Sequence, residues 1–104
     1  MSIDIGALFG NMAKSAGDAL GEGGEAVGKE MQAILEGNKQ AISELLEAKV
    51  KGEITDEIFE QELAREKSVL EAQLIGLEIQ AKAAIQKAVN AAMDTLKQTV
   101  SAAL

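Results

Sequence analysis

Small residues recur at helical spacing along the first quarter of the chain. They are Gly6, Gly10, Ala13, Gly17, Gly21, Gly24 and Gly28. An α-helix has 3.6 residues per turn, so steps of three and four residues keep such a set on one face. A flexible leader has no reason to keep that spacing. The sequence therefore predicts a helix over residues 5–28 with one face free of large side chains.

A helix with a glycine face needs a close neighbour. Each glycine in a helix interior costs about 1 kcal/mol relative to alanine, so residues 5–28 should be poorly helical alone. Small residues compensate when they let two backbones approach and gain dispersion contacts. An apolar face with Leu8, Phe9 and Met12 lies beside the glycine face, so we expect two neighbours, one very close. The polar face comprises Asn11, Lys14, Ser15, Asp18, Glu22, Glu25 and Lys29.

The composition extends the helical prediction to the rest of the chain. The 104 residues include no proline and only two aromatics, Phe9 and Phe59, while 47% are hydrophobic. Proline breaks helices and aromatics favour strands, so their scarcity favours helix throughout. The chain is too apolar for a disordered protein and long enough for one domain. We predict a single all-α domain over residues 1–104.

A helix–turn–helix signal divides the chain near its middle. Gly52 can adopt the left-handed conformation that ends a helix, and Thr55 can cap the next helix. Ile54 and Phe59 stand just before the cap and at the fourth helical residue, which is the spacing of a hydrophobic staple. The sequence therefore predicts a turn at residues 52–54.

The two arms that this turn joins are predicted to form a long antiparallel helical hairpin. The first arm covers residues 3–51 and the second covers 55–103. Residue i then lies opposite roughly residue 106 − i, so the glycine face of 6–28 meets the alanine-rich stretch of 78–100. Apolar residues of the second arm recur every eleven residues, which is three helical turns. The interface predicted on that arm comprises Leu63, Leu74, Ala81, Ile85, Ala88, Ala92 and Leu96.

Two short segments could interrupt the first arm. Gly37 is followed by Asn38, a combination that can stop one helix and cap another, so we expect a kink or a break there. The segment Gly21–Gly24, with the sequence GEGG, is a second candidate break. With such breaks the alternative architecture is a short three-helix bundle.

Residues 42–71 resemble the SHOCT module, a short helical hairpin often found at bacterial C-termini. The residues that fit its pattern are Leu45, Leu46, Lys51, Gly52, Ile54, Thr55, Phe59 and Leu63. The resemblance covers under a third of the chain, which continues over thirty residues beyond it. It implies an interaction or oligomerisation role and brings no catalytic residues.

The residue types argue against an enzyme. The chain has no His and no Cys, which removes the usual zinc sites and the nucleophiles that depend on His. Gly23, Gly28 and Lys29 have the spacing of a P-loop, but Glu30 stands where a Ser or Thr is needed and would repel phosphate. We predict no catalytic, cofactor-binding or metal-binding residues, and no cofactor.

Charge and hydropathy limit the partners and the location. The formal net charge of −7 makes nucleic acid an unfavourable partner, because such binding needs clustered basic residues. The first residues carry Asp4 instead of the basic start of a secretory signal. No run of about 18 uncharged apolar residues occurs. We expect a cytoplasmic protein by default, with leaderless export or membrane association left open.

Three functions compete for this sequence. The first is a non-enzymatic structural protein that self-associates, because both arms carry apolar faces wider than one contact can cover. In particular, the face with Ile75, Ile79, Val89, Met93 and Val100 would need a cover from another copy. The second is a membrane- or lipid-surface-active protein, such as a leaderless pore former or granule coat. The third is an adaptor or chaperone that binds a helix of another protein.

Overall fold

The computed structural model describes residues 3–104, which form five α-helices. They are α1 (Ile5–Leu20), α2 (Gly24–Gly37), α3 (Lys39–Val50), α4 (Asp56–Gly76) and α5 (Lys82–Ala103). None of the described residues belongs to a β-strand. The all-α prediction is therefore confirmed.

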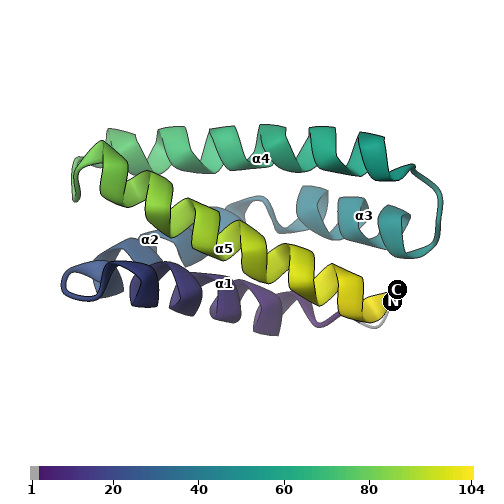
Figure 1. Ribbon diagram of the computed structural model, residues 1–104, viewed down its shortest axis with the longest axis horizontal. Helices are drawn as coiled ribbons and strands as arrows, with labels where there is room; N and C mark the ends of the chain where they lie inside the picture. Colours follow the sequence, from purple (N-terminus) through teal and green to yellow (C-terminus); the bar gives the residue numbers. More distant parts are fainter. Residues whose placement is uncertain (1–2) are drawn as a thin grey trace.

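The helices form an antiparallel bundle of four rods (Figure 1). The helices α2 and α3 run in the same direction with only Asn38 between them, so together they make one bent rod. Successive rods reverse direction, which brings the two ends of the chain to the same end of the bundle. Helix α1 packs most extensively against α5 and α2, and α4 borders α2, α3 and α5.

The predicted long two-arm hairpin is wrong. Arms of nearly fifty residues would extend about 70 Å at 1.5 Å per residue, whereas the molecule measures 38 × 22 × 20 Å. Loops at residues 21–23 and 77–81 divide the arms, which allows α1 and α5 to fold back over a shared core. The alternative of a three-helix bundle is also wrong, because the described residues form five helices.

The loop at residues 21–23 depends on backbone conformations that favour glycine. Gly21 has φ +67° and Gly23 has φ +82°, a region that residues with a Cβ enter only with strain. The Gly21 N–H donates to the carbonyl of Gly17 at 3.1 Å, which closes the last turn of α1. The break suggested at Gly21–Gly24 is therefore present, and it reverses the chain.

The break near Gly37 is also present, but it only bends the chain. Helix α2 ends at Gly37, and Asn38 leaves the helical conformation with φ −111° and ψ 16°. The Asn38 side-chain amide donates to the carbonyl of Ile34 at 3.3 Å and so satisfies one of the free groups at the end of α2. Helix α3 starts at the next residue and continues in nearly the same direction (Figure 1).

The predicted turn at residues 52–54 is confirmed. Gly52 has φ +75°, and the Glu53 N–H donates to the Ala48 carbonyl at 2.8 Å, which is a Schellman ending for α3. The Thr55 hydroxyl accepts from the Ile58 N–H at 3.1 Å and caps α4. Phe59 is buried and Ile54 is half-buried, so the apolar pair brackets the cap.

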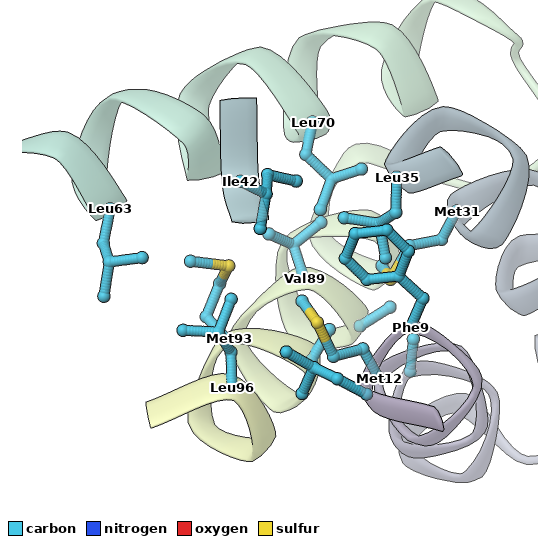
Figure 2. Close-up of a cluster of buried hydrophobic side chains, with 14 of the residues drawn as sticks. Phe9, Met12, Met31, Leu35, Ile42, Leu63, Leu70, Val89, Met93 and Leu96 are labelled. Carbon is cyan, nitrogen blue, oxygen red and sulfur yellow. The ribbon is translucent and has the colours of Figure 1, made fainter. Parts of the chain in front are cut away.

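All five helices contribute to a single apolar core (Figure 2). Phe9, Met12 and Met31 are fully buried near its centre. No polar or charged side chain within residues 3–104 is buried. Val89, Met93 and Val100, which the sequence analysis left for another copy to cover, are buried inside the bundle. Ile75 is half-buried and Ile79 is exposed, so the bundle itself covers most of this face and leaves only its end at the α4–α5 loop open.

Candidate interaction surface

Helices α1 and α2 meet through their backbones. A Cβ atom added to Gly24 would lie 2.1 Å from the carbonyl oxygen of Gly17, and one added to Gly28 would lie 2.7 Å from that of Ala13. Real Cβ atoms do not come that close to a backbone oxygen, so both positions require glycine as the backbone stands. The glycine face therefore has a very close neighbour, as its spacing predicted, and this neighbour is the other part of the same face.

The partner of the glycine face differs from the prediction. The face does not meet residues 78–100, because the turn at 21–23 folds it back on itself, so Gly17 meets Gly24. Helix α5 does lie along α1, but on another side, where Ser15 Oγ and Thr95 Oγ1 share a hydrogen bond of 2.6 Å. The predicted pairing of the first and last helices is therefore present with a different face.

The outer side of the α1–α2 contact is an open groove of about 510 Å³, which we call the α1–α2 groove. Its floor is formed by glycine and alanine residues, so no large side chain covers the two backbones there. Its lining residues are Gly10, Ala13, Lys14, Gly17, Asp18, Gly21, Gly24, Glu25, Gly28, Lys29 and Gln32. The groove therefore combines a smooth floor with charged edges.

The residues predicted for helix packing divide into three groups by exposure. The buried ones are Ala13, Gly24, Gly28, Leu63, Leu74, Ile85, Ala88, Ala92 and Leu96. Gly10 and Gly17 are half-buried, whereas Gly6, Gly21 and Ala81 are exposed. Ala81 is exposed because it caps the start of α5 at the loop. The structure thus brings most of the set into the bundle and leaves Gly6, Gly21 and Ala81 on the surface.

Charged residues at the edges of the groove were not predicted as part of this surface. Lys14, Asp18, Glu25 and Lys29 each directly follow a small residue of the glycine face. This repeated pairing of a small residue with a charged one is the sequence pattern that could have indicated the charged edges. Lys14 Nζ donates to Asp18 Oδ2 at 2.9 Å. This hydrogen bond and the attraction of the carboxylate raise the pKa of Lys14 above its usual 10.5.

Large apolar side chains are exposed at a few other places. They are Ile58 and Val69 on α4, Leu77 and Ile79 in the α4–α5 loop, and Leu104. On α4 they stand among carboxylates, since the helix carries Asp56, Glu57, Glu60, Glu62, Glu66 and Glu71 against Arg65 and Lys67. These side chains are scattered over two elements and the chain end, and none lines the α1–α2 groove.

A small internal space lies where α2 bends into α3. It measures about 20 Å³ and is lined mostly by apolar side chains, among them Met12, Leu35, Leu70 and Met93. A cavity needs roughly 10–15 Å³ to hold one water molecule, so this space suits nothing larger than a solvent-sized guest. It offers no room for a cofactor.

The described part of the chain has neither a metal-binding cluster nor a membrane-spanning helix. Residues 3–104 contain no grouping of three or more acidic side chains that could hold a metal ion. No helix in that range has the length and apolar character needed to cross a membrane. No family model, curated protein or solved structure compared with the chain matches it significantly.

Proposed function

We propose that this chain is a non-enzymatic structural protein whose folded bundles associate with one another through the α1–α2 groove. The bundle covers most of the apolar faces that first suggested an oligomer, so those faces no longer carry this proposal. The support now comes from Gly10, a glycine in the interior of α1 that lines the groove.

The bundle leaves room for a side chain at Gly10. A Cβ added there would meet nothing within 4 Å, in contrast to Gly24 and Gly28, where it would strike the backbone. Glycine inside a helix costs about 1 kcal/mol relative to alanine. Close approach of a second bundle to the groove would compensate for that cost through dispersion contacts. A second bundle bound at the groove would therefore explain why glycine occupies position 10.

The SHOCT-like hairpin is compatible with the same class of function. Residues 42–71 cover most of α3, the turn and most of α4. The resemblance implies an interaction role for such hairpins. It supports the class of the proposal, whereas Gly10 supports the particular surface.

Light scattering across a concentration series, without detergent or lipid, tests the proposal. We expect the mass of the parent protein to rise with concentration. Gly10→Leu should fold, because its side chain points into open space, and should have a lower average mass at the same concentration. Gly76→Leu is the matched control, since its Cβ would also meet nothing within 4 Å and it lies outside the groove.

Two results would contradict self-association. A parent that stays monomeric at every concentration would remove the proposed function. So would a monomer that gains helicity, by circular dichroism, only when anionic vesicles are added. That second result would favour the lipid-surface function instead.

A further inference from the structure

We infer that the occupant of the α1–α2 groove is a second copy of this chain, turned end for end about a two-fold axis that crosses the groove. This inference rests on the proposed function and gives it a geometry. It is argued from the order of the charges along the two edges of the groove.

Each end of the groove carries one sign of charge. The contact between α1 and α2 places Gly17 beside Gly24, and Ala13 beside Gly28. The residues that follow these pairs are Asp18 and Glu25 on the side of the 21–23 turn, and Lys14 and Lys29 about one helical turn further along. Both edges therefore run from acidic to basic in the same direction.

This order of charges distinguishes the two ways in which identical grooves can face each other. An axis along the groove would set Lys14 against the partner's Lys29, and Asp18 against the partner's Glu25. An axis across the groove sets Lys14 against the partner's Asp18. It likewise sets Lys29 against the partner's Glu25. Like charges oppose association and opposite charges favour it, so only the axis across the groove is complementary.

The same charges explain why a second copy would use this face. The chain has a net charge of −7, so two copies repel each other overall. The groove edges are neutral in sum, with Lys14 and Lys29 balancing Asp18 and Glu25. Helix α4 exposes Ile58 and Val69, but its excess of carboxylates would oppose the α4 of another copy. The α1–α2 groove is thus electrostatically favoured over the exposed face of α4 for self-association.

Charge reversal on the α1 edge tests the geometry. With the axis across the groove, Lys14→Glu sets carboxylates against carboxylates, and Asp18→Lys sets ammonium groups against ammonium groups. Each variant alone should dimerise on the order of tenfold more weakly than the parent, because attractive pairs become repulsive. An equimolar mixture of the two variants should restore the affinity, since the α1 edges of the two variants are then complementary.

The controls separate this inference from its alternatives. Lys87→Glu changes the net charge by the same amount as Lys14→Glu. Lys87 is exposed on α5 and lies outside the groove, so this variant should have a dissociation constant close to that of the parent. The dissociation constants come from sedimentation equilibrium, and thermal melts of dilute samples check that each variant folds.

Three outcomes would overturn the inference. If the parent associates and Lys14→Glu binds as tightly or more tightly, the axis across the groove is wrong and self-association stands. If the mixture of Lys14→Glu and Asp18→Lys stays as weak as either variant alone, the α1 edges do not face each other. If the parent is monomeric at every concentration, the proposed function fails together with the inference.

Discussion

Single glycines of α1, α2 and the turn between them act in different ways. Gly24 and Gly28 allow two backbones to touch, Gly21 and Gly23 allow the chain to reverse, and Gly10 faces open space. The first kind stabilises the bundle, the second permits its topology, and the third lowers the stability of the separate bundle. A residue type alone therefore does not give the effect of a substitution here.

Alanine substitutions should separate these kinds. We expect Gly28→Ala to lower the free energy of unfolding by about 1–3 kcal/mol, because its Cβ would displace the backbone around Ala13. Gly10→Ala should raise it by up to about 1 kcal/mol, because it adds helix propensity without a clash. Urea unfolding of monomeric samples gives both values. Equal changes for the two variants would contradict the backbone contact between α1 and α2.

Glu78 has a strained backbone conformation that a glycine would relieve. It follows the end of α4 with φ +56°, in the left-handed region that glycine occupies without cost. We expect Glu78→Gly to raise the free energy of unfolding by about 1 kcal/mol, measured by urea denaturation. Glu78→Ala serves as the control, since it removes the carboxylate and keeps the Cβ. A gain of equal size in both variants would assign the effect to charge instead of backbone conformation.

At the scale of elements, the turn between α3 and α4 is the part of the chain whose conformation depends most clearly on local interactions. Glycine ends α3, threonine caps α4, and Lys49 joins the two helices through an ion pair with Asp56. The Lys49 ammonium also lies 5.8 Å from the centre of the Phe59 ring. Local bonds therefore fix this hairpin with little help from distant residues.

Titration of Glu47 reports on the end of α3. A hydrogen bond from Lys51, at 2.6 Å, and its positive charge lower the pKa of Glu47 below its usual 4.5. Its carboxylate therefore favours the folded state above the unfolded pKa, and this contribution disappears as the pH falls through the folded pKa. We expect Lys51→Gln to raise the Glu47 pKa toward 4.5, measured by NMR. Lys49→Gln should leave the Glu47 pKa unchanged. If Lys49→Gln shifted this pKa and Lys51→Gln did not, the pairing of Glu47 with Lys51 would be refuted.

The other turns show where a single sequence stops being informative. The α3–α4 turn could be predicted because its signals are local and the next helix begins at once. The glycines at 21–24 marked a candidate break, but the reversal of the chain there could not be predicted. Glycines of both α1 and α2 face the same contact, so their spacing continues across the turn as if through one helix. The loop at 77–81 has no glycine at its left-handed residue, and Leu74 and Ile85 keep their eleven-residue spacing across it.

The candidate surface was predictable in its parts and not in its assembly. The glycine face and the polar face could both be read from the helical spacing of residues 5–28. Their position around one groove depends on the reversal at Gly21 and Gly23, which places Glu25 and Lys29 beside Asp18 and Lys14. Such a placement depends on tertiary packing, which helical periodicity does not contain.

At the scale of the whole molecule, the bundle is complete without a partner. The core is apolar and filled from all five helices, so most of the large apolar side chains are already covered. In the association proposed above, contacts between copies would therefore involve exposed charges and a shallow glycine floor. Such an association should be weaker than folding and separable from it.

This separation gives a joint prediction for salt and protein concentration. Because association binds only the folded bundle, the Tm of the parent should rise with protein concentration. Raising the salt from about 0.05 to about 0.5 M should reduce that rise, because exposed charge pairs are screened. Lys14→Glu should need roughly tenfold more protein for the same rise in Tm at low salt, because its association is roughly tenfold weaker. Scanning calorimetry measures these values, and a rise that salt leaves intact would mean that apolar contacts hold the copies together, as Ile58 and Val69 on α4 could.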